Sequence, residues 1–251
     1  MKPLKVKNMN KVKQNDYPNL HPSLTKPPFF SCIVGSRCSG KSNLVKNLIL
    51  RKDMYGDVFA PEDIFYISST VFVDDSCEDL PTEINKFDTF DMTMISDILE
   101  QCKDIKNHKG KKELPDILFI IDDLGAESKV CGRGGYLEQM SFTCRHFNVS
   151  CFVLVQKYSS VCPGIRNNSD LQIFFRPMNL KEIDHILDEH SDKSRKKAFT
   201  AMLNYAWAEP YDFFTISKKK PVKKGRYMRN FEEPLSLTDF KDGKVLDVMG
   251  A

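Results

Sequence analysis

The residues with the most specific chemistry in this chain are Gly35–Ser42, GSRCSGKS, which match the pattern G-x-x-x-x-G-K-S/T. Glycines in this pattern let the backbone turn tightly, so that successive N–H groups point at phosphate oxygens. Lys41 would reach the β- and γ-phosphates of a nucleotide, and the Ser42 hydroxyl would be a ligand of Mg²⁺. We expect nucleotide contacts from Gly35, Ser36, Arg37, Cys38, Ser39, Gly40, Lys41, Ser42 and Asn43.

A nucleotide site of this type also needs an acid at the end of a neighbouring strand, and residues 117–123, ILFIIDD, supply two. The apolar residues bury the strand, and the acids follow at its carboxyl end, where open α/β sheets bind ligands. We predict that Asp122 holds Mg²⁺, mostly through water, and that Asp123 polarises the attacking water. The next predicted strand ends in Gln156, a polar side chain placed to sense the γ-phosphate or to orient that water.

Three arginines are candidates for a positive charge supplied across a subunit interface, which ring-shaped motors commonly need for hydrolysis. Arg145 lies just before the strand that ends in Gln156, and Arg166 follows that glutamine by ten residues. Arg133 lies in a glycine-rich segment between the two strands. Of the three we favour Arg145 and keep Arg166 as the second candidate.

The hydrophobic pattern predicts the elements that must position these side chains. Short, continuously apolar runs bounded by turn residues indicate strands, and a 3.6-residue apolar period indicates helices. The strands are expected over 29–34, 63–69, 117–121, 150–156, 171–175 and 212–217, and the helices over 42–52, 92–102 and, as one or two, 180–203. Buried strands that alternate with helices predict an α/β fold with a mostly parallel sheet covered on both faces.

Composition limits the class of protein. The chain has 251 residues, of which 41% are hydrophobic and 28% charged, as in one large globular domain with appendages. Its 8 cysteines are too sparse for a disulfide scaffold, and no apolar run is long enough to span a bilayer. The N-terminus lacks the apolar stretch of a secretory signal, so we expect a protein that is not secreted, with reduced thiols.

Basic residues are concentrated in particular segments, although the formal net charge is only +3. Residues 1–28 carry six lysines against one acid, residues 218–229 carry seven basic side chains and no acid, and lysines recur over 103–112. Such patches are typical of proteins with polyanionic partners. We divide the chain into a basic N-terminal arm (1–28), a nucleotide-binding domain (29–217) and a basic C-terminal tail (218–251).

Taken together, these residues resemble the genome-packaging ATPases of poxviruses, other large DNA viruses and virophages, within the FtsK–HerA superfamily of P-loop NTPases. The resemblance runs from about Pro22 to Phe231. It rests on the Pro-Pro-Phe before the first strand, GSRCSGKS, FIIDDLG, Arg145-His146, FVLVQK, the PGIRNN segment and the late Tyr227-x-x-Asn230-Phe231. The paired aspartates are frequent in this viral branch.

The resemblance implies a RecA-like core with an additional strand between the two nucleotide-binding strands. It implies ATP and Mg²⁺ as ligands and a homo-oligomeric ring, a pentamer or hexamer, that moves double-stranded DNA into a capsid, at a portal vertex, in the host cytoplasm (the viral factory) or the virion. Within Gly125–Tyr136, the glycine-rich loop carries Lys129 and Arg133. A basic loop straight after the acid strand could line a central pore and contact DNA phosphates.

Three other functions use the same loop. A helicase-loader-type or other DNA-dependent accessory ATPase would carry an appended helical lid with a sensor arginine. A small-molecule kinase would need an acceptor pocket and would bind no DNA. A non-hydrolysing DNA-binding protein with a vestigial site would not be expected to keep Lys41, Ser42, Asp122 and Asp123.

Overall fold

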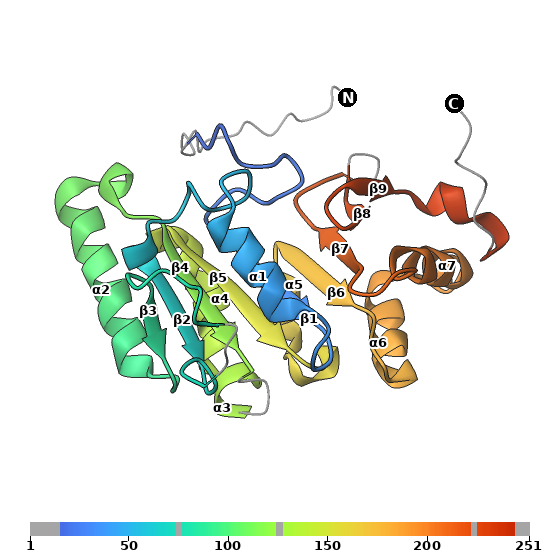
Figure 1. Cartoon of the computed structure of the whole chain (residues 1–251), viewed down its shortest axis with the longest axis horizontal. Coiled ribbons are helices and arrows are strands. Elements are labelled where there is room, and N and C mark those ends of the chain that lie inside the picture. The colour runs from blue at the N-terminus through green and yellow to red at the C-terminus, as the bar shows by residue number, and fades with distance from the viewer. Residues whose placement is uncertain (1–15, 74–76, 124–127, 222–224, 244–251) are drawn as a thin grey trace, which may run out of the picture.

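The chain is folded around a nine-stranded sheet with the strand order β3-β2-β4-β5-β1-β6-β7-β8-β9 (Figure 1). This computed structural model describes residues 16–73, 77–123, 128–221 and 225–243. The strands are β1 Phe30–Val34, β2 Ile64–Ser68, β3 Asn85–Phe87, β4 Ile117–Asp122, β5 Val149–Val155, β6 Leu171–Phe175, β7 Phe213–Ser217, β8 Tyr227–Arg229 and β9 Glu233–Leu235. Strands β1 to β6 are parallel to one another, whereas the pairs β6–β7, β7–β8 and β8–β9 are antiparallel.

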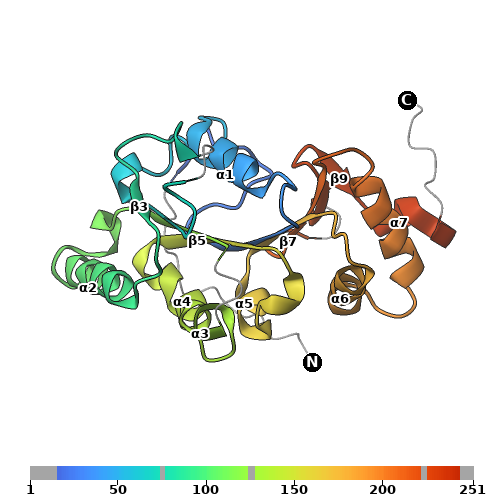
Figure 2. The same ribbon diagram turned by 60° about the horizontal axis from the view of Figure 1, so that its bottom comes forward.

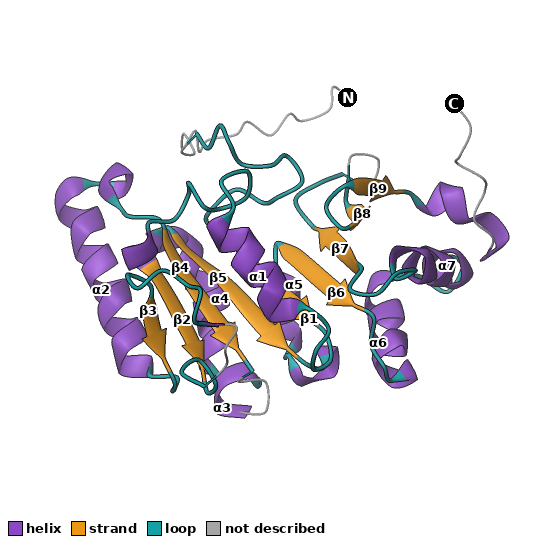
Figure 3. Cartoon of the chain, viewed as in Figure 1, coloured by secondary structure: helices purple, strands orange, loops and turns teal. Residues whose placement is uncertain are grey.

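Helices cover both faces of this sheet (Figures 2 and 3). They are α1 Lys41–Leu50, α2 Met92–Lys109, α3 Ser128–Cys131, α4 Tyr136–Thr143, α5 Pro163–Asn168, α6 Leu180–His190 and α7 Lys196–Ala206. In Figure 2, α1 lies on one face, while α2, α4, α5 and α6 lie on the other. The predicted α/β fold is therefore confirmed, and the segment expected as one or two helices over 180–203 forms two.

The central strands are mostly apolar because they are buried on both sides. In β4, Phe119 and Ile121 face the core shared with α2 and α4, whereas Leu118 and Ile120 face the core under α1. Helix α1 completes the second core with its buried stripe Leu44, Val45, Leu48 and Ile49. This double burial explains why the parallel strands show no polar alternation in the sequence.

Strand β5 separates the two strands that carry the predicted site. Leu154 of β5 pairs with Ile33 of β1 on one side and with Asp122 of β4 on the other. The additional strand that the resemblance implies is thus present. Because β1, β4 and β5 are parallel, their carboxyl ends meet at one edge of the sheet, and the phosphate-binding loop, Asp122 and Gln156 meet there too.

Several elements differ from those predicted. The sheet continues past Ser217, where we placed the start of a tail, because β8 and β9 add two short strands to β7. The pattern also missed β3, α3, α4 and α5, which are too short for a periodicity to emerge. Helix α2 runs seven residues beyond the predicted Cys102, since lysines continue the helix until Gly110, at φ 93°, ends it.

The described part of the basic arm and tail is packed against the body of the protein. Lys219 Nζ donates a hydrogen bond to the carbonyl of Pro28 at 3.4 Å, and Lys220 Nζ donates to that of Pro22 at 2.8 Å. The buried Tyr55 hydroxyl donates to the carbonyl of Thr25 at 2.8 Å. Lys219, Lys220 and Tyr55 therefore all bind the backbone of the segment before β1. Residues 1–15 and 222–224 lie outside the described structure. In the portions of the chain that the structure describes, no helix has the length and apolarity needed to cross a membrane.

Candidate nucleotide-binding site

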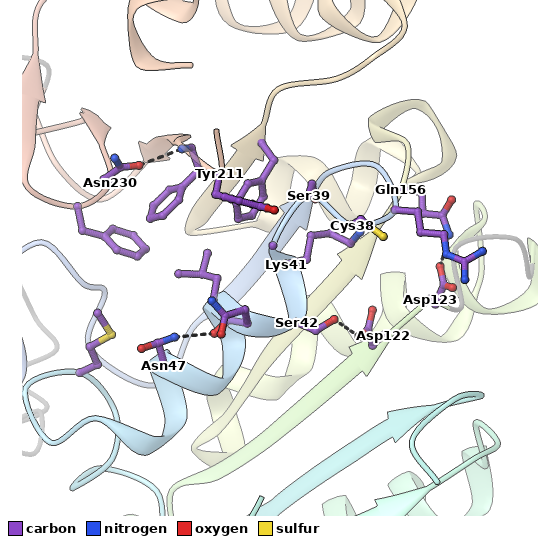
Figure 4. A pocket seen from close by; sticks show the side chains of 18 of the residues that line it. Cys38, Ser39, Lys41, Ser42, Asn47, Asp122, Asp123, Gln156, Tyr211 and Asn230 are labelled. Atoms are coloured by element: carbon purple, nitrogen blue, oxygen red, sulfur yellow. Dashed lines mark hydrogen bonds between the residues drawn. The ribbon is translucent and has the colours of Figure 1, made fainter. Parts of the chain in front are cut away.

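A cleft of about 1190 Å³ opens at the carboxyl edge of the parallel strands, between the phosphate-binding loop and the ends of β4 and β5 (Figure 4). Most of the predicted site residues line it. They are Arg37, Cys38, Ser39, Gly40, Lys41, Ser42, Asn43, Asp122, Asp123 and Gln156. Gly35 and Ser36 form the start of the same loop, so the structure brings the predicted nucleotide site together.

The loop needs glycine at two of its positions. Gly40 has φ 100°, in the left-handed region that side chains disfavour. A Cβ atom on Gly35 would collide with Ser39 Oγ and lie 2.9 Å from Cβ of Phe175 on β6. Glycine at these two positions lets the loop backbone pass close to β6 and turn into the N-terminus of α1. A backbone that turns in this way presents its N–H groups to an anion.

Lys41 lies inside the loop. Its Nζ donates hydrogen bonds to the carbonyl oxygens of Gly35 at 2.7 Å and Ser36 at 3.0 Å. Burial lowers the pKa of this ammonium, and the negative charges of Asp122 and Asp123 partly offset that effect. A partly desolvated cation held beside the loop is well placed to bind the β- and γ-phosphates.

Asp122 meets Ser42 across the cleft. The hydroxyls of Ser42 and Tyr66 both donate to its Oδ2, at 3.3 and 3.2 Å. Burial raises the pKa of Asp122, while Lys41 and the hydrogen bond from Tyr66 act in the opposite direction. The charged form needed for metal binding thus depends on these neighbours.

Asp123 and Gln156 form the second pair. Gln156 Nε2 donates a hydrogen bond to Asp123 Oδ1 at 2.7 Å, although the two residues lie on different strand ends. Asp123 itself has φ 61°, a left-handed conformation that is uncommon for residues other than glycine. Such backbone conformations cluster at functional sites, where the surrounding structure maintains them. The turn directs the Asp123 carboxylate toward Gln156 (Figure 4).

The chemistry of the residues present fits a magnesium nucleoside triphosphate. Ser42 and Asp122 offer hard oxygen ligands from two directions, and Mg²⁺ in such sites takes its remaining ligands from water and phosphates. The N-terminus of α1 has no side-chain cap, which leaves its N–H groups for an anion. Within the described residues, the buried Ser39 Oγ has no hydrogen-bond partner, so the loop contains a donor that a phosphate oxygen would satisfy.

The structure places the candidate arginines differently. Arg145 is exposed in the 3₁₀ turn Cys144–Phe147, at the amino end of β5 and so at the opposite edge of the sheet from the loop. Arg166 makes its contacts within its own subunit. Its Nε lies 2.8 Å from Glu189 Oε2, and its guanidinium carbon lies 4.8 Å from the centre of the Tyr158 ring. These contacts turn Arg166 inward, whereas Arg145 and Arg133 are exposed.

The predicted DNA-contact residues lie on the cleft side of the molecule. Arg133 is exposed in the turn between α3 and α4, and Lys129 belongs to α3, where only its backbone is described. In Figure 1, α3 lies at the same edge of the sheet as the phosphate-binding loop. The start of the glycine-rich loop, 125–127, falls outside the described residues, so DNA contact stays a prediction.

Sequence reasoning missed one side of the cleft and one residue beneath it. The missed side is formed by Tyr211, which precedes β7, and by the turn Asn230–Glu232 between β8 and β9. Asn230 and Phe231 had a signal in the late Tyr227-x-x-Asn230-Phe231 pattern, whereas Tyr211 had none. Tyr66, beneath the cleft, lies in an expected strand, but nothing in the sequence pairs it with Asp122.

The fold and the site together define a P-loop NTPase of the RecA-like type with an additional strand. The family model for Poxvirus A32 protein matches residues 19–209. The chain therefore belongs to the Poxvirus A32 protein family, which confirms the resemblance drawn from the motifs. A search of curated proteins finds no match.

Solved structures show the same fold at low sequence identity. The genome packaging NTPase B204 from Sulfolobus turreted icosahedral virus 2, in complex with ATPγS, is 15% identical, with a TM-score of 0.51 over 78% of this chain and 94% of B204. Its sulfate complex aligns over 84% of this chain and all of B204, with 13% identity and a TM-score of 0.52. The pCW3 conjugation coupling protein TcpA with ATPγS is 14% identical, with a TM-score of 0.52 over 77% of this chain and 58% of TcpA.

Proposed function

We propose that this protein is an ATP-driven motor that translocates double-stranded viral DNA into a capsid. The observation that carries the proposal is the convergence of two pairs, Ser42 with Asp122 and Asp123 with Gln156, around the phosphate-binding loop. A loop alone would support only nucleotide binding, whereas the second pair adds the groups that hydrolysis needs. Membership of the Poxvirus A32 protein family and the packaging role of B204 support the assignment to genome packaging.

Each residue has a defined role in this proposal. The loop N–H groups and Lys41 hold the triphosphate, and Ser42 and Asp122 hold Mg²⁺, which when bound neutralises phosphate charge. Asp123 accepts a hydrogen bond from the attacking water and increases its nucleophilicity. Gln156, already bonded to Asp123 at 2.7 Å, orients that water and links the state of the γ-phosphate to β5.

Translocation requires several copies, and we propose a homo-oligomeric ring in which Arg145 of one subunit enters the cleft of the next. Arg145 is exposed and lies at the sheet edge opposite its own cleft, which suits a residue that acts on a neighbour. In the same proposal Lys129 and Arg133 contact the DNA backbone, so binding would be independent of sequence and sensitive to salt. The capsid or its portal vertex would be the further partner, in the host cytoplasm or the virion.

The helicase-loader alternative is less well supported. A loader would carry a helical lid after the core, whereas here β7 leads into the antiparallel strands β8 and β9. Those strands extend the sheet and place the turn Asn230–Glu232 beside the cleft.

The test measures ATP hydrolysis with and without double-stranded DNA on the full chain. We expect DNA to stimulate hydrolysis, and Lys41→Ala to abolish it while thermal unfolding stays near that of the wild type. Lys52→Ala removes an exposed lysine just beyond α1 and serves as the matched control that retains activity. A hydrolysis rate that DNA does not raise, or one that Lys41→Ala does not lower, would overturn the proposed function.

A further inference from the structure

Tyr211 occupies an unusual place at the mouth of the cleft. The residue is 71% exposed, yet a Cβ atom on Gly40 would lie only 3.3 Å from the ring atom Cδ1. The ring therefore stands beside the residue that precedes Lys41. It lies on the other side of the loop from Asp122, Asp123 and Gln156 (Figure 4).

The backbone at Tyr211 is held in a conformation that an aromatic residue disfavours. Its φ is 68°, in the left-handed region, and Asn230 and Phe231 in the facing turn have φ 53° and 62°. Three left-handed residues other than glycine thus line one side of the cleft. Strain of this kind persists only where surrounding contacts over-determine it, and it is characteristic of ligand sites.

Those contacts come from a polar cluster that we call the Asp212 cluster, formed by Asp212, Arg229 and Asn230. The Asp212 carboxylate accepts hydrogen bonds from Arg229 Nη2 at 2.6 Å and Asn230 Nδ2 at 2.5 Å. Burial would raise the pKa of Asp212, but the bonds from Asn230 and Arg229 lower it, so the carboxylate stays charged. Asn230 Oδ1 also accepts the N–H of Phe213 at 3.0 Å. The cluster joins the segment before β7 to the turn after β8.

The wall behind Tyr211 is aromatic. The rings of Phe175 and Phe213 are 5.5 Å apart, and those of Phe213 and Phe231 are 5.0 Å apart, both measured between centroids. Phe231 and Met54 continue this apolar surface along the cleft, with Asn47 of α1 near it. A cavity of apolar side chains with a few polar groups at its rim is typical of a site for a planar organic group.

A nucleotide whose triphosphate is held by Lys41 and Ser42 must also place its ribose and base. Tyr211 lies on the side of the loop away from Asp122, where the ribose and base have room (Figure 4). We propose that Tyr211 is the base-stacking residue of the nucleotide site and that the Asp212 cluster holds its ring in place. The inference rests on the proposed ATP-binding function and adds the residue that recognises the nucleoside. Tyr211 and the cluster lie beyond residue 209, where the family match ends.

The experiment compares two probes by calorimetry in the presence of Mg²⁺: ATPγS, which has a base, and inorganic tripolyphosphate, which has none. We expect Tyr211→Ala to weaken ATPγS binding on the order of tenfold to a hundredfold, as loss of a base–aromatic stack does, and to leave tripolyphosphate binding unchanged. Tyr211→Phe should bind both probes like the wild type. Arg229→Gln should weaken ATPγS binding by a smaller factor, again without affecting tripolyphosphate.

The matched control is Phe142→Ala, which removes an aromatic side chain of 52% exposure outside the cleft and should change neither affinity. Equal loss of both probes in Tyr211→Ala would mean that the ring supports the loop, and unchanged ATPγS binding would mean that it contacts a subunit or DNA instead. Either result would overturn the inference. DNA-stimulated hydrolysis by the wild type tests the proposed function separately, because the difference between the two probes does not depend on DNA or turnover.

Discussion

Tyr66 offers the sharpest test of the proposed Mg²⁺ site. The Tyr66→Phe variant deletes one hydroxyl that donates to Asp122 Oδ2 at 3.2 Å and keeps the buried ring. Asp122 is only 9% exposed, so water replaces that hydrogen bond poorly. We expect the variant to keep its fold and its affinity for ATPγS without metal, and to require more Mg²⁺ for activity.

The size of the effect follows from the geometry. A hydrogen bond to a charged group is worth about 1.5–3 kcal/mol. At 3.2 Å the bond from Tyr66 is long, so we take about 1.5 kcal/mol, which corresponds to about a tenfold rise in the Mg²⁺ concentration for half-maximal hydrolysis. Partners that orient a metal ligand commonly change metal affinity by about 10–100-fold, which is consistent with this estimate.

The assay is hydrolysis as a function of free Mg²⁺ at a fixed, saturating ATP concentration. Rates at saturating Mg²⁺ should stay within about twofold of the wild type, because Asp123 and Gln156, which we propose position the attacking water, are untouched. Loss of the hydroxyl also raises the pKa of Asp122 further. Protons then compete more strongly with Mg²⁺, so the shift should grow as the pH falls.

The control is Tyr55→Phe, which removes a buried hydroxyl of the same kind that donates to the carbonyl of Thr25 at 2.8 Å, away from the cleft. It should lower stability without altering the Mg²⁺ requirement. The reasoning is refuted if Tyr66→Phe leaves the Mg²⁺ dependence unchanged, or if both variants change it by the same factor.

The remaining predictions concern the arginines and one buried histidine. Mixing Arg145→Ala with Asp123→Ala subunits should partly restore hydrolysis, because each supplies what the other lacks across an interface; no rescue at any ratio would exclude Arg145 from acting in trans. Arg166→Ala should lower the free energy of unfolding in urea by about 1–3 kcal/mol, since it removes the guanidinium from Glu189 Oε2 and leaves that carboxylate, among the described residues, with only the Tyr158 hydroxyl, whereas Arg145→Ala should change it by less than about 0.5 kcal/mol. Burial lowers the pKa of His190 from its ordinary value of 6.5 to about 4. The unfolded chain therefore binds a proton first as the pH falls, so wild-type stability relative to His190→Gln should fall by about 2 kcal/mol between pH 7 and pH 5 and should be flat above pH 7.

The sequence by itself determined the phosphate-binding loop and the positions of the central strands along the chain. Both are local properties: the loop depends on glycines within Gly35–Ser42, and each buried strand is a short apolar run that ends at a turn. The positions of Asp122 and Gln156 at the site followed from the same logic, because the carboxyl ends of parallel strands must meet at one edge. The hydrogen bonds that Asp122 and Gln156 make with Ser42 and Asp123 were not predicted, and the first of them crosses the intervening strand β5.

Only the tertiary structure decided which side chains act on these residues. Tyr66 reaches Asp122 across 56 positions of sequence, and Tyr211 reaches the loop through an antiparallel strand whose position depends on the Asp212 cluster. The same is true of Arg166, which looked like a candidate for a neighbour's site until Glu189 of α6 was placed beside it. Side chains from distant elements meet because whole sheets and helices pack, and that packing is a sum of many weak contacts that no short pattern encodes.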